Sequence, residues 1–114
     1  MHRLYTTSVA SVFVHYVAKV ERKGRTREEL DAVVTWLTGL SPAQVQQHLD
    51  AGTTFEDFFD AVELNPDVSL ITGSVCGVKV QEVEDPLMRR IRYLDKLVDE
   101  LAKGRPLEKV LRSS

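Results

Sequence analysis

Apolar residues recur along this chain at intervals of three and four, the spacing that places them on one face of an α-helix. The first such stripe follows Ser8, a residue type that caps helices, and stops before Gly24, a residue type that ends them. Its members are Val9, Val12, Phe13, Tyr16, Val17 and Val20. Many are β-branched or aromatic, so a helix over 8–23 is predicted while a strand stays open for 9–20.

Capping signals divide the next part of the chain into three further helices. Each start shows a polar cap followed three residues later by an acidic or amide side chain: Thr26 with Glu29, Ser41 with Gln44, and Thr54 with Asp57. The helices predicted in this way span 27–38, 42–51 and 54–62. The inner face of the last one carries Phe55, Phe58, Phe59 and Val62. Asn65 and Pro66 then force a turn.

The pattern changes over residues 69–83. Two glycines interrupt a β-branched stretch, and valines alternate with polar residues over Val78–Gln81 as they do in a half-buried strand. We therefore expect a short strand or hairpin here, or an ordered loop that lies across the helices.

Asp85 and Pro86 start the longest predicted helix, over 86–103, and a short one follows over 106–112. Apolar residues of the long helix form a seam with coiled-coil spacing: Leu87, Ile91, Leu94, Val98 and Leu101. Beside the seam lie Met88, Tyr93 and Leu97, and the short helix adds Leu107, Val110 and Leu111. The seam can pack on the chain's own helices, but one small core is not expected to cover all of this surface. We therefore predict a homodimer through residues 86–112.

These elements predict one mainly α domain over 1–114, a compact bundle of about five short helices with a short β-strand or hairpin before the long C-terminal helix. A length of 114 residues suits one domain, which buries roughly two-thirds of its unfolded surface. No internal repeat or linker divides the chain.

Composition narrows the class of protein. A net charge of −2 argues against a general nucleic-acid binder, which carries a basic excess, and gives no reason to expect a membrane partner. The apolar run over 9–20 is shorter than the roughly 20 residues that cross a bilayer. A single cysteine, Cys76, cannot form an internal disulfide. We expect a cytoplasmic protein.

Six segments, in the same order and over nearly the whole chain, resemble a family of small bacterial proteins, domain of unknown function 2200. They are Glu21–Thr26, Trp36–Gly39, Leu64–Pro66, Val75–Val78, Glu84–Met88 and Ile91–Val98. The likeness departs from the expected pattern at Phe13–His15, where a tyrosine followed by a proline is expected. The resemblance implies a small cytoplasmic bacterial protein with a largely helical fold, and it implies no activity.

Cys76 is the candidate nucleophile, because the neighbouring glycines can expose backbone donors for an oxyanion. Such a cysteine needs a base, which His15 or His48 supplies only if the fold brings it close. The alternative is a buried, inert thiol, the commoner state of free cysteine. No signature of a cysteine enzyme is present, so we do not expect an enzyme.

The loop Ser69–Val78 is the predicted place for a small ligand. Its candidates for an anion cradle are Ser69, Thr72 and Ser74, with Arg25 as a counter-charge. No cofactor is predicted. No metal site is predicted either, because the histidines and the cysteine lack ligand spacing.

Basic residues gather at 22–27 and again at 89–92. Tight turns between short helices are also typical of helix-turn-helix modules, so these clusters raise a nucleic-acid function. Acidic neighbours at 28–31 would repel phosphates, and the helix over 42–51 has no lysine or arginine to read a groove. Nucleic-acid binding is therefore not expected.

Two classes of function stay open. The first is a non-enzymatic protein-interaction or self-associating module, favoured by the seam over 86–101. The alternative is a small-molecule-binding protein or enzyme that uses the Ser69–Val78 loop with Cys76. A helix-turn-helix-like nucleic-acid binder is a second alternative.

Overall fold

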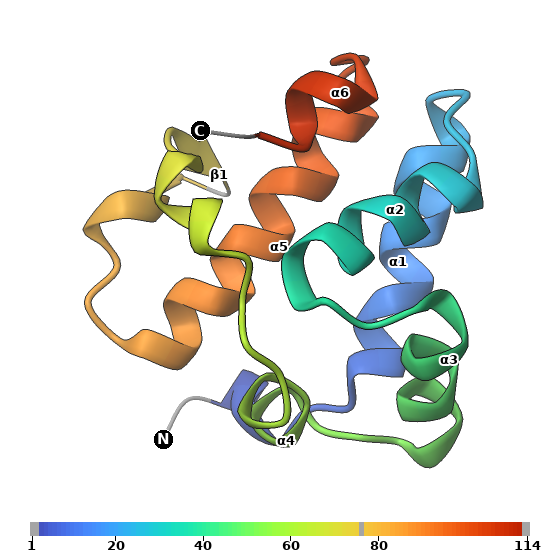
Figure 1. Cartoon of the computed structure of the whole chain (residues 1–114), viewed down its shortest axis with the longest axis vertical. Helices are drawn as coiled ribbons and strands as arrows, with labels where there is room; N and C mark the ends of the chain where they lie inside the picture. The colour runs from blue at the N-terminus through green and yellow to red at the C-terminus, as the bar shows by residue number, and fades with distance from the viewer. Residues whose placement is uncertain (1–2, 76, 113–114) are drawn as a thin grey trace.

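Helix α5 (Pro86–Ala102) lies at the centre of the molecule in the computed structural model, which describes residues 3–75 and 77–112 (Figure 1). Helices α1, α2, α4 and α6 and the hairpin all contact it, whereas α3 packs on α1 and α2. The other helices are α1 (Val9–Arg22), α2 (Arg27–Thr38), α3 (Pro42–Ala51), α4 (Phe55–Asp60) and α6 (Leu107–Val110), with a 3-10 helix η1 (Arg3–Thr6) before α1. The mainly α fold predicted from the sequence is confirmed.

The predicted caps form as the sequence indicated. In each case a side-chain oxygen of the cap accepts a hydrogen bond from a backbone N–H three residues on. The pairs are Ser8 with Ser11, Thr26 with Glu29, Ser41 with Gln44, Thr54 with Asp57 and Asp85 with Met88. These local bonds explain why the helix starts were predictable, and residues 9–20 are helical throughout.

Two helices end earlier than predicted. Helix α4 stops at Asp60 rather than at residue 62, and α6 covers only Leu107–Val110 instead of 106–112. Arg90 reaches from α5 to the end of α4, where its Nη1 donates to the carbonyl of Phe59 at 3.0 Å. The N–H of Val62 donates to the same carbonyl at 3.4 Å, so this carbonyl at the end of α4 has both a local and a distant donor.

The β element is a two-stranded antiparallel hairpin. Strand β1 (Ser74–Val75) pairs with β2 (Val78–Lys79), with Val75 opposite Val78. The 3-10 helices η2 (Pro66–Leu70) and η3 (Val80–Glu82) flank it. Val80 is buried and Gln81 exposed, so the predicted in-and-out alternation holds even where the strand has given way to η3. The hairpin prediction is confirmed.

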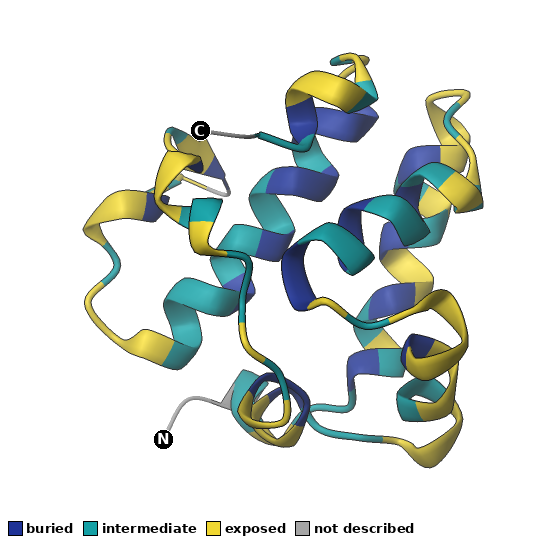
Figure 2. Cartoon of the chain, viewed as in Figure 1, coloured by how far each residue is buried: buried dark blue, intermediate teal, exposed yellow. Residues whose placement is uncertain are grey.

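The core lies between α5 and the helices around it (Figure 2). Four of the five seam residues are fully buried, and Leu87 is half-buried. From α4 all three phenylalanines enter the core, where the rings of Phe58 and Phe59 meet edge to face at 5.3 Å. On α1 the buried members of the predicted stripe are Val9, Phe13, Tyr16 and Val20.

A backbone bridge that the sequence did not predict joins the starts of α1 and α4. The N–H of Val9 donates to the carbonyl of Thr53 at 2.8 Å, and the N–H of Phe55 donates to the carbonyl of Thr7 at 3.1 Å. Ser8 and Thr54 thus pair as a single antiparallel β-bridge. Both are extended cap residues, so the same conformation serves the caps and the bridge.

The predicted dimer surface over 86–112 is partly used within the chain. Leu97 and Val110, expected to supply surplus apolar surface, are buried by their own chain, as is Leu94. Apolar residues of this region that stay half-buried are Leu87, Met88, Tyr93, Leu107 and Leu111. A homodimer would have to be built from these.

The homodimer is tested by sedimentation equilibrium at micromolar concentration. The predicted result is a dimer. Tyr93→Glu should dissociate it, because the carboxylate placed at this half-buried position would have to be desolvated at the interface. Val14→Glu, which alters an exposed valine of α1, should leave the assembly unchanged. A wild-type monomer would end the prediction, since Leu94 and Leu97 are already covered.

Phe58→Ala should destabilise the domain by about 3–5 kcal/mol, because it removes a side chain that is 1% exposed and leaves a cavity beside Phe59. Urea unfolding measures the loss. Val14→Ala should change the free energy of unfolding by less than about 0.5 kcal/mol, since Val14 is 61% exposed. Equal losses in the two variants would contradict the packing described above.

Candidate functional site

Hydrogen bonds with two side chains of the protein hold the backbone of the Ser69–Val78 loop in place. The N–H of Gly73 donates to Oε1 of Gln81 at 3.1 Å, and the carbonyl of Ser74 accepts from Lys96 Nζ at 3.2 Å. A Cβ at Gly73 would lie 3.2 Å from Cε of Lys96, so glycine lets this lysine pass close to the backbone. Ser69, Thr72 and Ser74 are exposed. Cys76 lies outside the described residues.

Arg25, the predicted counter-charge of the loop, donates hydrogen bonds to backbone carbonyls at and just beyond the end of α5 instead. Its Nη2 pairs with Glu29 at 2.7 Å, and its Nη1 donates to the carbonyls of Leu101 (3.2 Å) and Arg105 (2.8 Å). A guanidinium at the C-terminus of a helix satisfies carbonyls that lack an intrahelical donor. The cation at the loop is therefore Lys96, not Arg25.

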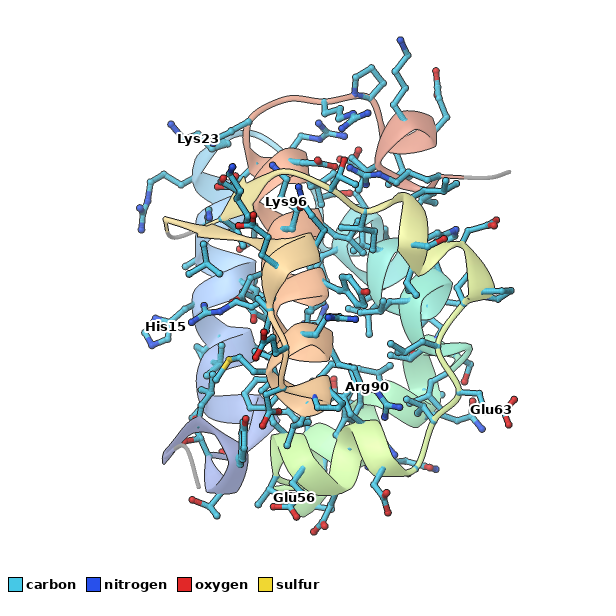
Figure 3. The ribbon with its side chains drawn as sticks, turned by 90° about the vertical axis from the view of Figure 1, so that its left-hand side faces the viewer. His15, Lys23, Glu56, Glu63, Arg90 and Lys96 are labelled. Atoms are coloured by element: carbon cyan, nitrogen blue, oxygen red, sulfur yellow. The ribbon has the colours of Figure 1, made fainter. Side chains whose placement is uncertain are left out.

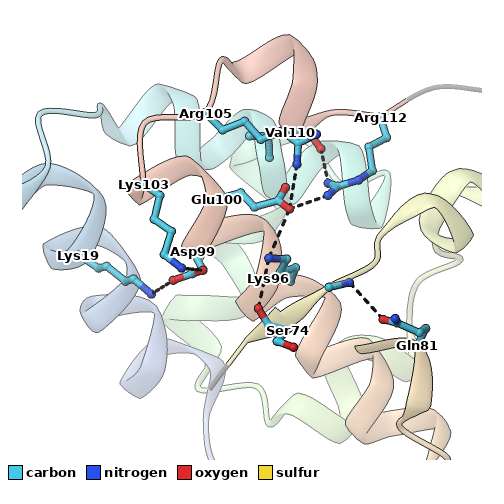
Figure 4. Close-up of polar contacts among 11 residues, drawn as sticks. Lys19, Ser74, Gln81, Lys96, Asp99, Glu100, Lys103, Arg105, Val110 and Arg112 are labelled. Atoms are coloured by element: carbon cyan, nitrogen blue, oxygen red, sulfur yellow. Dashed lines mark hydrogen bonds and ion pairs between the residues drawn. The ribbon is translucent and has the colours of Figure 1, made fainter. Parts of the chain in front are cut away.

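Glu100 is a buried carboxylate on α5 that joins three parts of the chain (Figure 4). Its Oε2 is contacted by Arg112 at 2.6 Å, Arg105 at 3.0 Å and Lys96 at 3.6 Å. Arg112 in turn accepts a hydrogen bond at its carbonyl from Trp36 Nε1 at 3.2 Å. The cluster ties the hairpin, α2 and the C-terminal segment to α5.

A hollow of about 180 Å³ lies between α1, α5 and β1. Its lining residues are His15, Tyr16, Lys19, Val75, Asp95 and Val98. The Tyr16 hydroxyl donates to Oδ1 of Asp95, and Arg92 Nη1 pairs with Oδ2 at 3.0 Å. Of the predicted loop only Val75 takes part, and the polar residues come from α1 and α5. We call this the hairpin hollow.

The two histidines considered as bases lie in different places. His15 is exposed and projects from α1, so it lies at the rim of the hairpin hollow (Figure 3). The His48 ring packs edge to face on Phe58 at 5.3 Å, and its Nδ1 lies 3.1 Å from Thr53 Oγ1. His48 is thus a packing residue, and His15 alone of the two lines the hollow beside the hairpin.

A second, wider hollow of about 490 Å³ opens over Trp36, between α2 and the start of α3. It is mainly apolar, and its lining residues are Glu28, Asp31, Ala32, Thr35, Trp36 and Pro42. Trp36 is half-buried, which makes it an edge residue of the core. Thr35 Oγ1 is buried without a partner among the described atoms. We call this the Trp36 hollow.

Most arginines of the basic clusters bind their own chain. Arg27 pairs with Asp31 at 2.9 Å and lies over the ring of Phe13, 4.8 Å from its centroid. Arg89 donates to the carbonyl of Val83 at 2.6 Å. The bond to Asp31 neutralises Arg27, whereas the bond from Arg89 to a carbonyl positions its guanidinium without neutralising it.

Within residues 3–75 and 77–112, no three histidine, aspartate or glutamate side chains gather as metal ligands would. None of the helices in that part of the chain is long and apolar enough to cross a lipid bilayer.

Local bonds shift the pKa of three carboxylates. The Arg25 guanidinium and the Thr26 N–H lower the pKa of Glu29. At Asp85 the Met88 N–H, helped by the Tyr5 hydroxyl, lowers the pKa. Burial raises the pKa of Asp99, but hydrogen bonds from Lys103 and Lys19 outweigh it and lower the pKa overall. These shifts favour the ionised forms of the three carboxylates.

The sequence profile of a family described as an uncharacterized protein conserved in bacteria (DUF2200) matches residues 3–112. The chain belongs to this family. Its fold is similar to the crystal structure of uncharacterized protein SP1917, which is 45% identical. That similarity covers 97% of this chain and 93% of the other, with a TM-score of 0.90. No curated protein matches the chain.

The Arg25–Glu29 pair predicts a pH dependence of stability. Because the folded pKa of Glu29 lies below its ordinary value of 4.5, the carboxylate stabilises the fold above that pH. This contribution is lost as pH falls through the folded pKa. The stability difference between wild type and Glu29→Gln should therefore shrink as pH falls below about 4.5. Urea unfolding from neutral to acidic pH measures it, and a constant difference would contradict the assignment.

Proposed function

We propose that this bacterial protein is a cytoplasmic, non-enzymatic interaction module that holds a partner protein at the Trp36 hollow. The observation that carries the proposal is the lining of this hollow, where apolar side chains from α2 and α3 stay open to solvent beside a tryptophan. Trp is enriched among the residues that dominate binding energy at protein interfaces.

The shape of the hollow favours a protein over a small molecule. It opens widely to solvent, whereas a site for a small ligand usually encloses 70–90% of the ligand's surface. A protein can insert one apolar side chain here and complete the interface on the surrounding surface of α2 and α3. In such an interface only the inserted side chain occupies the hollow, so a shallow hollow is enough.

The charged residues at the rim of the Trp36 hollow indicate which residues of the partner lie next to its inserted apolar side chain. Glu28 is exposed, and Asp31 shares its charge with Arg27 at 2.9 Å. One carboxylate is thus left to attract a cation from a partner. We infer a partner segment with a large apolar residue close to a lysine or arginine.

A random peptide library displayed on phage and selected on the whole protein tests this proposal. The enriched peptides should carry a leucine or aromatic residue within a few positions of a basic residue. Ala32→Arg should weaken their binding at least about tenfold, because the new side chain fills the hollow with a charge. Glu28→Lys should weaken it as well, by reversing the charge at the rim.

Ala18→Arg is the matched control, because it places the same side chain on an exposed position of α1 outside the hollow. It should leave the affinity unchanged. Enriched peptides that are acidic, or that bind the Ala32→Arg variant as well as wild type, would refute the proposal.

A further inference from the structure

Residues 107–112 form a segment that packs on α5 and then leaves the helical conformation. Val110, at the end of α6, is fully buried, and Leu107 and Leu111 pack against the core beside it. The N–H of Leu111 still donates to the carbonyl of Leu107 at 2.9 Å, as in a helix. The N–H of Arg112 instead turns back to the carbonyl of Val110 at 3.1 Å. The helix therefore no longer fixes where Arg112 lies.

The side chain of Arg112 supplies the missing anchor. Its Nη2 pairs with Oε2 of Glu100 at 2.6 Å, and its Nη1 donates to the carbonyl of Val110 at 3.1 Å (Figure 4). The side chains of Arg112 and Glu100 are only 11% and 7% exposed, so salt and water screen this pair little. Removing the guanidinium would take a cation from a buried carboxylate and free the backbone after Val110.

The backbone of Arg112 in turn holds the tryptophan of the Trp36 hollow. Its carbonyl accepts a hydrogen bond from Trp36 Nε1 at 3.2 Å, and Trp36 lines the hollow. A largely buried indole N–H needs such an acceptor, so the ring cannot turn freely while the bond is in place. The links run from Glu100 to the guanidinium of Arg112, and from its carbonyl to the indole.

We propose that residues 107–112 control the Trp36 hollow. While Arg112 is paired with Glu100, the indole is held in the orientation that lines the hollow. When the segment detaches, the indole loses its acceptor and this wall of the hollow is no longer fixed. The inference rests on the proposed function and names what regulates that site. By linkage, attachment of the segment and binding of a partner strengthen each other by the same factor.

The indole N–H of Trp36 reports attachment directly. Trp36 is the one tryptophan in the sequence, so the ¹⁵N-labelled protein gives a single indole signal in its amide spectrum. Arg112→Gln should shift this signal and speed hydrogen exchange of the indole N–H about threefold to tenfold, the factor that one hydrogen bond corresponds to. An unchanged signal and exchange rate would overturn the proposal.

Arg105→Gln is the matched control. Arg105 Nη1 contacts the same oxygen of Glu100 at 3.0 Å, so this variant removes the same charge from the same carboxylate. The acceptor of the Trp36 N–H belongs to Arg112, and the indole signal should therefore stay as in wild type. Equal changes in the two variants would overturn the proposal, since only the charge around Glu100 would matter. Arg112→Lys keeps a cation for Glu100 and should restore most of the protection.

Peptides selected on the wild-type protein test control of the hollow itself. Arg112→Gln should weaken their binding about threefold to tenfold, and Arg105→Gln should not. In the wild type, saturating peptide should slow exchange of the Leu111 N–H by at least the factor that Arg112→Gln costs in affinity. Leu111 does not line the Trp36 hollow, so the peptide would protect it only by keeping the segment attached.

These measurements separate this inference from the proposed function. If no peptide is enriched, the partner proposal fails, and the indole signal alone decides whether the segment positions Trp36. If Arg112→Gln changes the indole signal but not the peptide affinity, control by the segment is overturned and the partner site stands. Urea unfolding of each variant confirms that the fold is intact.

Discussion

The structure depends on the burial of the apolar face of α5. Leu94, Leu97, Val98 and Leu101 are each at most 1% exposed, and their spacing places them within about 100° of one another around the helix. Such a face must be covered by other elements. Here α1, α2, α4 and α6 pack on α5 together with the hairpin, and Glu100 is buried as well. Its charge requires cations, and Lys96, Arg105 and Arg112 supply them from α5 and the C-terminal segment.

Polar contacts also fix the position of one apolar residue in each hollow. Lys96 bonds the carbonyl of Ser74 and so holds the hairpin against α5, where Val75 becomes a wall next to α1. Trp36 donates to the carbonyl of Arg112, which fixes one edge of the indole and leaves another facing the hollow over α2. In both places an ion pair or hydrogen bond of the core sets the position of an apolar wall.

The features that could be predicted from the sequence depend on residues close together in the chain. A cap such as Thr26 and its partner Glu29 are three residues apart, so the helix starts and the hairpin followed from short patterns. The bonds that build the hairpin hollow join residues 79 and 80 positions apart, Tyr16 to Asp95 and Lys19 to Asp99. No spacing rule links such pairs, because only the packing of α1 on α5 brings them together. Of the glycine-rich loop only Val75 lines this hollow, and the polar residues that line it come from α1 and α5.

The two hollows differ in the polar residues that line them. The Trp36 hollow is lined by the carboxylates Glu28 and Asp31, whereas the hairpin hollow combines Asp95 with His15 and Lys19. Arg25, in the turn between α1 and α2, bonds the last carbonyls of α5 and holds the three helices together. The two hollows share no lining helix, since α2 and α3 line one and α1, α5 and β1 line the other. They are joined through the packing of α2 and α3 on α1 and of α2 on α5.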